Sequence, residues 1–527
     1  MEPQIRTLVD ISDTPAARNG RAELLLERAH WAAAVFQRYD RVRTMAIVDA
    51  VAAAAHANAQ RFAEAAVEET GFGVAAHKKL KNELTAGPLV DHYRDADFVN
   101  PRIDEARKIV ELPRPAGVIF ALTPSTNPIA TLNYKIILAL MTRNAIVISP
   151  HPAARKCSVE AARALMEAAR SAGAPDGVIQ IIEDPAIPLI ETIMASPLTN
   201  LILATGGTAM VRAAYSSSNP AIGVGPGNAP VLVDGSADLE RAAKHIVESK
   251  SFDNSILCTN ESVIVTLPEV TTQLERALKS AGAHVCSAEE VERLRRFLFH
   301  ERGFNVEAIG RDAIWIAKEC GIRVPSGTRI LVTPIDKIGE EERLSREKLC
   351  PVLALHTAKN RAQALEQCRA ILRLTGAGHS AAIHARDPQL TMAYAARVEA
   401  YRVVVNAPCS QGAAGFATNL APTFTVGTGY FGRSSIGENV GPQHLVHWTR
   451  IAHNSDAAES FDNYAGLGPE LSGALPQAPA DGMPGAGRPA EPAARNAPGR
   501  EGAGLDGATR DELRRLIAEE LRDLLRK

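Results

Sequence analysis

Hydrophobic residues follow two clear rhythms along this chain. Between Arg21 and Val67 they recur at helical spacing in a sequence rich in Ala, Leu, Glu and Arg, which predicts two long helices. From Val118 to Pro230, short apolar runs alternate with Ala-rich helical stretches, and the alternation returns from about Val263 to Val426. Such alternation is typical of repeated β-α-β units, in which helices cover a parallel sheet. We therefore expect two α/β domains.

The apolar runs also place individual strands. In the first region the predicted strands are Val118–Leu122, Ala145–Ser149, Val178–Ile182 and Leu201–Thr205, with helices near Tyr134–Met141 and Ser158–Ala172. In the second region they are Val263–Thr266, Ile330–Thr333, Val352–His356, Ala381–His384 and Arg402–Asn406.

The sequence changes character at residue 466. In residues 466–507, 26 of the 42 residues are Gly, Pro or Ala and none is aromatic or β-branched, so this segment is expected to be a disordered linker. In residues 508–527, Leu and Ile recur every three or four positions behind a capping box formed by Thr509 and Glu512. This pattern favours a tethered amphipathic docking helix; the alternative is a helix that folds back onto its own domain or dimer.

Composition narrows the function. With 60 acidic and 58 basic residues the net charge is −2, which gives no overall attraction to nucleic acid or to an anionic membrane. No uncharged apolar run is long enough to span a bilayer, and the N-terminus lacks the features of a signal peptide, so a cytoplasmic protein is expected. The seven cysteines form no C-x-x-C pair and have no zinc-like spacing to His, which argues against disulfides and a metal site and leaves single reactive thiols.

Cys258 is the best candidate for such a thiol. It lies in a polar, non-periodic stretch, Ser251–Glu261, just before a predicted strand, where substrate and backbone N–H donors can reach it. Cys157 is a rival, because it opens a helix whose dipole could lower its pKa, and Cys409, in another turn, is third.

Nine short motifs follow one another in order along the chain. They are Glu69–Gly73, Thr123–Pro128, Ser149–Pro152, Ala204–Thr208, Pro220–Pro230, Ser251–Glu261, Glu347–Pro351, Gly376–Ser380 and Glu438–Pro442. Each motif is weak alone, but the ordered set is specific. Over about residues 20–455 it resembles the CoA-acylating aldehyde dehydrogenases, including the aldehyde half of bifunctional alcohol/aldehyde dehydrogenases and the acetaldehyde or propionaldehyde dehydrogenases of bacterial microcompartments.

The resemblance implies a fold and its division. Two Rossmann-like parallel-sheet domains are expected: an NAD-binding domain at 1–235 and a catalytic thiol domain at 236–428. Residues 429–465 would return to the cofactor domain. A small antiparallel oligomerisation arm would combine residues of about 101–115, especially Arg107–Pro113, with about Gln443–Ile451. By resemblance the subunits form a homodimer or tetramer.

The resemblance also assigns catalytic roles. Cys258 corresponds to the nucleophile that forms a thiohemiacetal and then a thioester, and Asn127 to the amide of the oxyanion hole. Without the family, Asn127 reads as a turn former before Pro128. Hydrolytic relatives carry a general-base glutamate where this chain has Val224, and valine cannot activate water. The expected product is therefore an acyl-CoA.

The dinucleotide site is likewise implied by resemblance, because no G-x-G-x-x-G follows a predicted strand. The cofactor-binding candidates are Thr123, Pro124, Ser125, His151, Gly206, Gly207 and Glu347. Gly206 and Gly207 could equally form a plain strand-to-helix turn. NAD is expected and NADP stays open, since no carboxylate lies beside His151 to bind a ribose 2′-hydroxyl.

The leading hypothesis is an enzyme that oxidises a short-chain aldehyde with NAD and coenzyme A to an acyl-CoA. The alternatives are a hydrolytic aldehyde dehydrogenase and a non-catalytic scaffold or shell-binding protein. Related microcompartment enzymes carry a tethered amphipathic helix, commonly at the N-terminus, that directs them into a protein shell. Here the matching feature is residues 508–527, which suggests a shell protein or co-encapsulated enzyme as partner and the microcompartment lumen as location.

Overall fold

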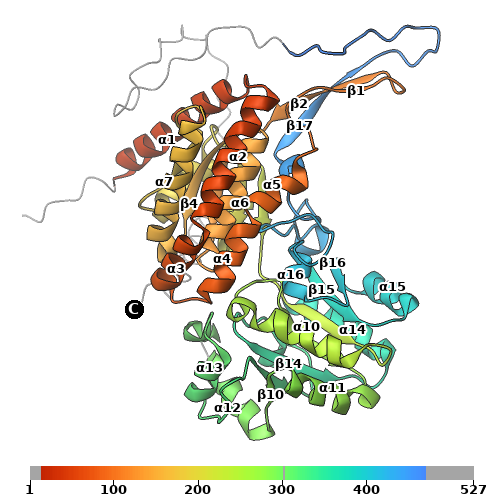
Figure 1. The fold of residues 1–527 in the computed structure, drawn as a ribbon. Coiled ribbons are helices and arrows are strands. Elements are labelled where there is room, and N and C mark those ends of the chain that lie inside the picture. The colour runs from red at the N-terminus through yellow and green to blue at the C-terminus, as the bar shows by residue number, and fades with distance from the viewer. Residues whose placement is uncertain (1–13, 301–302, 470–527) are drawn as a thin grey trace, which may run out of the picture.

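Two parallel sheets and one small antiparallel sheet organise the chain in a computed structural model that describes residues 14–300 and 303–469 (Figure 1). The two parallel sheets form two lobes, and the antiparallel sheet projects from the first lobe as an arm. Apart from its first four residues, the expected linker at 466–507 lies outside the described residues, as does the expected docking helix at 508–527.

The first sheet is parallel, with strand order β5-β4-β3-β6-β7. Its strands are continuous apolar runs that are buried on both faces, as parallel sheets require. They are β3 (Val118–Thr123), β4 (Ala145–Pro150), β5 (Ile179–Ile181), β6 (Leu201–Thr205) and β7 (Ala221–Val224).

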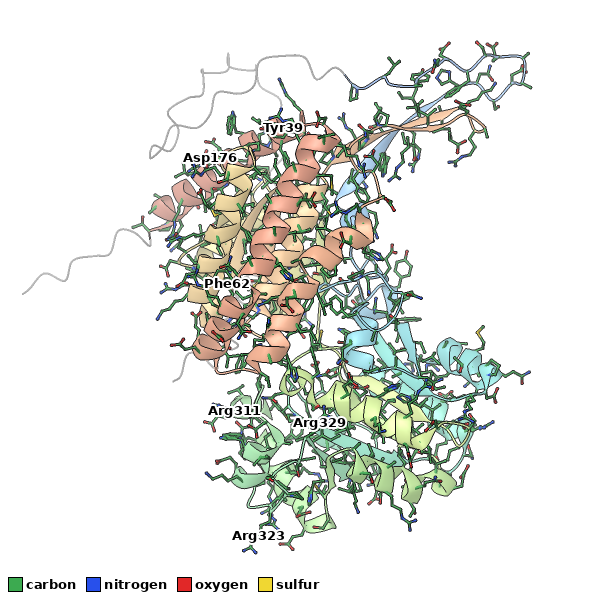
Figure 2. The ribbon with its side chains drawn as sticks, viewed as in Figure 1. Tyr39, Phe62, Asp176, Arg311, Arg323 and Arg329 are labelled. Carbon is green, nitrogen blue, oxygen red and sulfur yellow. The ribbon has the colours of Figure 1, made fainter. Side chains whose placement is uncertain are left out.

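Helices cover this sheet in layers. Helices α6 and α7 pack on one face with α2 and α3 outside them, while α1 packs with α8. Tyr39, between α1 and α2, donates to the Gly173 carbonyl at 3.0 Å and ties these helices to the end of α7 (Figure 2). The helices of this lobe are α1 (Pro15–Phe36), α2 (Arg41–Ala57), α3 (Ala59–Thr70), α4 (Ala75–Leu84), α5 (Gly87–Tyr93), α6 (Pro128–Met141), α7 (Arg155–Ser171), α8 (Ile187–Ala195) and α9 (Thr208–Tyr215).

The prediction of two helices between Arg21 and Val67 is wrong, because three helices cover this stretch. Asp40 caps the second by accepting the Arg43 N–H at 2.8 Å, and Asn58 leaves helical geometry between the second and the third. The Ala-rich pattern runs through Asn58 without Gly or Pro, so hydrophobic spacing alone gives no sign of that break.

The second sheet is also parallel, with strand order β10-β13-β14-β9-β8-β15-β16. Its strands are β8 (Ala229–Val233), β9 (Glu261–Thr266), β10 (Ala283–Val285), β13 (Ile330–Pro334), β14 (Val352–Thr357), β15 (Gly378–His384) and β16 (Ala400–Val405). Its helices are α10 (Leu239–Ser251), α11 (Pro268–Ser280), α12 (Ala288–Leu298), α13 (Ala313–Glu319), α14 (Arg361–Leu374), α15 (Pro388–Arg397) and α16 (Cys409–Ala413). A two-stranded hairpin, β11 (Phe299–His300) with β12 (Gly303–Phe304), follows α12.

Every strand that the apolar pattern predicts is present in these two sheets, to within about three residues at either end. The pattern gives no sign of β7, β8 or β10. The chain passes from the first sheet to the second between Val224 and Ala229, before the boundary expected at residue 235.

The arm joins segments that are far apart in the sequence. Strand β2 (Ile109–Pro115) pairs antiparallel with β1 (Arg102–Asp104) on one side and with β17 (Val446–Ala452) on the other. The two strand pieces expected near 107–113 and 443–451 are therefore paired within one chain. Among the described residues, no helix is both long and apolar enough to cross a membrane.

Candidate functional site

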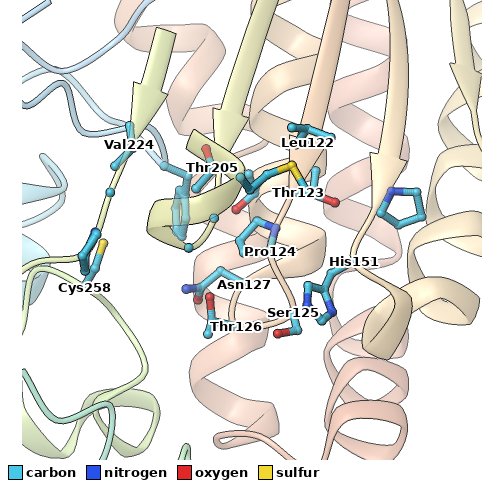
Figure 3. A pocket seen from close by; sticks show the side chains of 18 of the residues that line it. Leu122, Thr123, Pro124, Ser125, Thr126, Asn127, His151, Thr205, Val224 and Cys258 are labelled. Carbon is cyan, nitrogen blue, oxygen red and sulfur yellow. The ribbon is translucent and has the colours of Figure 1, made fainter. Parts of the chain in front are cut away.

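A cavity of about 620 Å³ opens where the carboxyl ends of β3, β4 and β6 face the loop that precedes β9. Ligands of open parallel sheets bind at such strand ends. All of the residues predicted from the sequence line this one cavity: Thr123, Pro124, Ser125, Asn127, His151, Gly206, Gly207, Cys258 and Glu347. Figure 3 shows Cys258 on one side of it, with Asn127, Ser125 and His151 across the space.

Cys258 stands apart from the other thiols. The described residues include all seven cysteines, and the other six are buried. Loss of hydration, with a smaller contribution from Glu347, raises the pKa of the Cys258 thiol to about 12. The resting sulfur is therefore a neutral thiol that needs a partner to remove its proton during reaction.

His379 is placed to be that partner, and it is not among the site residues predicted from the sequence. Its Nε2 lies 3.2 Å from the Cys258 Sγ, and its Nδ1 lies 3.1 Å from the Ser380 hydroxyl. Burial, and then the positive charge of Arg402, lower the pKa of His379 to about 3, so the imidazole is neutral. A neutral ring whose Nδ1–H donates to Ser380 leaves Nε2 free to accept the thiol proton. The Gly376–Ser380 motif contains this histidine and was the available signal.

The two rival cysteines, Cys157 and Cys409, are buried and do not line the cavity, whereas Cys258 does. Cys157 does lie in the first turn of α7, but the Glu69 carboxylate accepts its backbone N–H at 2.7 Å. Burial and that carboxylate raise the pKa of Cys157, opposite to the shift that a helix dipole would give. Cys409 is fully buried, which raises the pKa of its thiol well above the ordinary value.

Asn127 precedes α6, but its side chain makes no capping hydrogen bond to that helix. Its Oδ1 instead accepts a hydrogen bond from the Lys81 ammonium group. In Figure 3 the amide nitrogen of Asn127 lies on the side that faces Cys258. The arrangement leaves an N–H donor at the cavity wall, as an oxyanion site needs.

The turn that delivers Cys258 is strained. Helix α10 ends at Ser251, and in the 3-10 segment that follows, η3 (Phe252–Ser255), residues 253, 254 and 255 have φ values of 50°, 51° and 63°. Left-handed backbone costs roughly 1–2 kcal/mol for each residue that is not glycine. Such a turn persists only where its surroundings hold it firmly.

Buried groups from the first lobe hold this turn. The Asp253 carboxylate accepts the Val74 N–H at 2.6 Å and the Lys78 ammonium at 3.1 Å, and it also pairs with Lys81. Burial opposes its ionisation, but Lys81 and Lys78 outweigh this and hold the pKa of Asp253 below its ordinary value. Gly73 has a φ of +79°, and a Cβ there would lie 2.2 Å from Asp253 Oδ1, so glycine is required.

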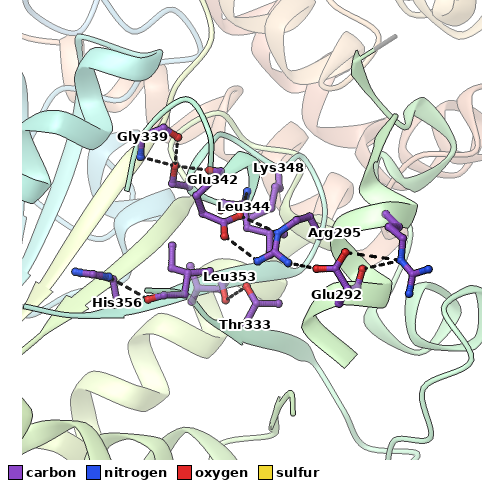
Figure 4. Close-up of polar contacts among 12 residues, drawn as sticks. Glu292, Arg295, Thr333, Gly339, Glu342, Leu344, Lys348, Leu353 and His356 are labelled. Carbon is purple, nitrogen blue, oxygen red and sulfur yellow. Dashed lines mark hydrogen bonds and ion pairs between the residues drawn. The ribbon is translucent and has the colours of Figure 1, made fainter. Parts of the chain in front are cut away.

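Glu347 enters the cavity from the second lobe. Its Oε1 accepts the Gly227 N–H at 3.2 Å, and burial raises the pKa of its carboxyl to about 8. The preceding loop is anchored by Arg295, which donates to both carboxylate oxygens of Glu342 at 2.7 and 3.2 Å (Figure 4). The adjacent Lys348 is buried, and its ammonium donates to three backbone carbonyls. Glu347 is therefore fixed in position.

The first-lobe wall suits a dinucleotide. The hydroxyl oxygens of Thr123 and Ser149 are buried and, within the described residues, have no hydrogen-bond partner, although both residues line the cavity. Buried polar atoms usually have a hydrogen-bond partner, and a polar ligand in the cavity could provide it. Gly206 follows β6, and Gly207 precedes α9 without a side-chain cap, so the start of that helix lines the cavity and has backbone N–H groups that no side chain caps.

His151, also on this wall, accepts the Ala153 N–H through Nδ1 at 3.1 Å. Burial lowers its pKa to about 4, so it carries no charge at neutral pH. Arg155, which could have met a phosphate, pairs with Asp184 at 3.1 Å and does not line the cavity.

Val224 ends β7, is 3% exposed and also belongs to the cavity wall. Among the described residues that line the cavity, Glu347 is the only acid, and none is Lys or Arg. At Val224 the cavity wall is therefore apolar, and Glu347 is the one carboxylate among the described lining residues that could act as a base.

Away from the cavity, His284, Cys286 and Glu290 offer ligand atoms within 4.8 Å of one another. Glu290 there pairs with His284 at 3.1 Å and forms a capping box with Ser287 at the start of α12. These contacts account for the grouping as a structural one.

The sequence of this chain is similar to those of several known enzymes. Residues 3–292 match the aldehyde dehydrogenase family. The chain is 36% identical over 400 residues to the aldehyde-alcohol dehydrogenase of Clostridium acetobutylicum, a match that covers 75% of this chain and 46% of that protein. It is 35% identical to the acetylating succinate-semialdehyde dehydrogenase of Clostridium kluyveri, covering 82% of this chain and 96% of that one. The chain thus spans about half the length of the aldehyde-alcohol dehydrogenase and almost all of the succinate-semialdehyde dehydrogenase.

Solved structures agree. An acetylating aldehyde dehydrogenase from Geobacillus thermoglucosidasius superposes with a TM-score of 0.82 at 36% identity, covering 84% of this chain and 99% of that one. A propionaldehyde dehydrogenase from the fucose utilisation bacterial microcompartment of Clostridium phytofermentans superposes with a TM-score of 0.74 at 30% identity, covering 81% and 96%.

Proposed function

Because this chain belongs to the aldehyde dehydrogenase family, and within it resembles the acylating members, we propose that it converts an aldehyde and coenzyme A to an acyl-CoA with reduction of NAD. The observation that supports this most directly is one cavity in which an accessible Cys258 meets His379, while valine stands at position 224. A covalent thioester can form on Cys258, and position 224 offers no carboxylate to activate water for its hydrolysis.

Cys258 supplies the nucleophile. As its sulfur bonds to the aldehyde carbon, the thiol proton moves to Nε2 of His379, and the carbonyl oxygen becomes an alkoxide held by the Asn127 amide. A dinucleotide held at the first-lobe wall by groups such as Thr123, Ser149 and the Gly206–Gly207 turn would supply the hydride acceptor, and loss of a hydride from that carbon would let the C=O bond re-form as a thioester on Cys258. His379 releases its proton to solvent before the second half of the reaction, which accounts for the one proton produced overall.

Acyl transfer uses the same pair. The coenzyme A sulfur attacks the thioester carbon while its proton passes to His379, which is neutral at rest. The bond to the Cys258 sulfur breaks, and the leaving thiolate recovers a proton from His379. The enzyme returns to its starting state without another base.

The nearest rival is a hydrolytic aldehyde dehydrogenase in which another carboxylate, here Glu347, activates water. Measuring NADH formation with and without coenzyme A separates the two. We expect NADH to accumulate beyond one equivalent per site only when coenzyme A is present. Val224→Glu should add free acid to the products, because it places a carboxylate near the thioester. Equal turnover without coenzyme A in the unaltered enzyme would favour hydrolysis.

The proposed aldehyde is short and uncharged. The cavity wall contains no Lys or Arg among the described residues, so nothing there balances a carboxylate or a sulfonate on the substrate. Ile256, Leu257 and Phe424 instead give the cavity apolar surface. We expect kcat/KM for acetaldehyde or propionaldehyde to exceed that for succinic semialdehyde by at least about 10-fold, because an unpaired charge would have to leave water.

NAD is proposed over NADP, because the neutral His151 and the paired Arg155 leave no cation in the wall for a 2′-phosphate. The ratio of kcat/KM for the two dinucleotides tests this. A preference for NADP would contradict the assignment.

The proposal extends to assembly and location. The arm of β1, β2 and β17 supports an oligomer of identical subunits, which sedimentation would measure. The sequence of residues 508–527 supports delivery into a microcompartment by binding a shell protein. Residues 508–527 fused to a fluorescent protein should co-localise with shell proteins, and Leu516→Glu with Leu521→Glu should abolish this. Diffuse fluorescence of the unaltered fusion would end the idea.

A further inference from the structure

Lys81 links two parts of the site that lie on different lobes. It stands on α4 and is 2% exposed, and its ammonium contacts both the Asp253 carboxylate below the strained turn and the Oδ1 of Asn127. The neighbouring Lys78 also reaches Asp253, and it donates to the Thr126 carbonyl at 3.0 Å. The buried Lys81 ammonium group thus connects helix α4 to Asn127 and to the turn before Cys258.

The chemistry of the contact fixes the direction of the amide. An ammonium group has only donors, so the atom of Asn127 that meets it must be the carbonyl oxygen. The NH₂ group then points the other way, toward the side of the cavity that holds Cys258 (Figure 3). A rotated amide would set its N–H donors against the Lys81 cation.

We propose that Lys81 is a positioning residue that fixes the Asn127 amide with its NH₂ group toward the aldehyde oxygen. This inference rests on the proposed role of Asn127 as an oxyanion donor. Lys81 does not line the cavity that holds the thiol. Its effect on the reaction passes through Asn127, and the positive charge of Lys81 beside Oδ1 also makes the N–H on the other side of the amide a stronger donor.

Charge balance makes the proposal testable without unfolding the protein. Asp253 retains Lys78 and the Val74 N–H when Lys81 is removed, so no carboxylate is left unpaired. Burial, partly offset by Asp253, lowers the pKa of Lys81 to about 8, so an uncharged side chain of similar length avoids the desolvation cost that this ammonium group bears. Lys81→Met keeps the length and removes the donor.

The experiment is a double-mutant cycle on the full enzyme. Single-turnover NADH formation with propionaldehyde and NAD, without coenzyme A, is measured for Asn127→Ala, Lys81→Met and the double variant. Removing an oxyanion donor lowers this rate by about 100-fold or more. We expect Lys81→Met to lose at least about 10-fold, and the double variant to lose no more than about three-fold beyond Asn127→Ala, because both changes remove one interaction.

Two controls separate positioning from damage. Alkylation of Cys258 by iodoacetamide forms no alkoxide, so its rate should stay within about two-fold of the unaltered enzyme in Lys81→Met. Lys79→Met, on the exposed face of the same helix where Lys79 pairs with Glu83, should change neither rate.

Each outcome decides a different point. Normal NADH formation in Lys81→Met, or losses that multiply in the double variant, would overturn the inference. Normal NADH formation in Asn127→Ala would refute the oxyanion role itself and the inference with it. If Lys81→Met does not fold, Lys81→Leu, which also lacks a donor, takes its place in the cycle. Its losses must again fail to multiply with those of Asn127→Ala.

Discussion

The two walls of the cavity differ in the groups that they present and in the charges packed directly behind them. The wall from the first lobe, called the neutral wall below, presents strand ends, small hydroxyl groups and the start of a helix. It includes a neutral His151 and no charged side chain among its described residues. The wall that carries Cys258, called the thiol wall below, has buried charged groups packed behind it. Asp253 pairs with two lysines behind the strained turn, and Arg402 donates to the His379 carbonyl.

This difference fits the proposed reaction, in which ligands must leave one wall while the other stays fixed. Backbone donors and neutral hydroxyls bind polar ligands without trapping them, since each contributes only about 0.5–1.5 kcal/mol. A nucleophile, in contrast, must be held within a fraction of an ångström of its productive position. Buried ion pairs with few alternatives supply that rigidity.

Loss of the sulfur should have the largest effect. Cys258→Ala should lower acyl-CoA formation by at least about 10⁴-fold, because no other atom can form the covalent intermediate. NAD binding, measured by fluorescence titration, should stay within about two-fold, because the other wall is unchanged.

Cys157→Ala and Cys409→Ala are the matched controls and should keep most of the activity, since both thiols are buried away from the reaction. Appreciable turnover by Cys258→Ala would refute the mechanism.

The next largest effect should follow from removing the buried carboxylate of Asp253 behind the thiol wall. Asp253→Asn leaves two buried lysines without a carboxylate, and the free energy of unfolding should fall by about 3–5 kcal/mol. The matched change on the other wall is Asp184→Asn, which removes an exposed ion pair with Arg155 and should cost less than about 1 kcal/mol. Denaturant titration compares the two variants. Equal losses would show that the walls are not supported differently.

The reactivity of the thiol should rise with pH over a wide range. The pKa of Cys258 is raised to about 12, so its thiolate fraction is still increasing at pH 10. The rate of alkylation by iodoacetamide in the absence of NAD should therefore climb from pH 7 to pH 10 without levelling. A plateau near pH 8 would show that the wall lowers the pKa of the thiol instead.

The smallest effect should come from the neutral wall. His151→Ala removes a ring with no charge at neutral pH, so KM for NAD should rise by less than about 10-fold while kcat stays within about two-fold. Steady-state kinetics at saturating coenzyme A measures both. A loss of kcat comparable to that of Asn127→Ala would place His151 in the chemistry.

The neutral wall could be predicted from the sequence far better than the charged one. Leu201–Thr205 is a continuous apolar run that ends at two glycines, and the strand has those same bounds. The short polar motifs that follow such strands then mark the cavity, because strand ends share one edge of a parallel sheet. Their positions in the sequence and in space agree.

The support of the thiol wall could not be predicted in this way. Lys78 and Lys81 lie in a helix rich in lysine, which by pattern alone reads as a solvated face, yet both are buried. His379 meets Cys258 across 121 residues, and only the packing of β15 against the neighbouring strands brings them together. No periodicity encodes contacts of that kind.

Gly227 sets a boundary for anyone who redesigns the range of aldehydes. A Cβ at this position would lie 2.0 Å from the carbonyl oxygen of Cys258, so every other residue type would push the nucleophile out of place. Libraries for directed evolution should keep Gly227 fixed and vary Ile256, Leu257 and Phe424, which line the cavity with replaceable apolar surface. Variation there can reshape the acyl pocket while the backbone that carries the sulfur keeps its course.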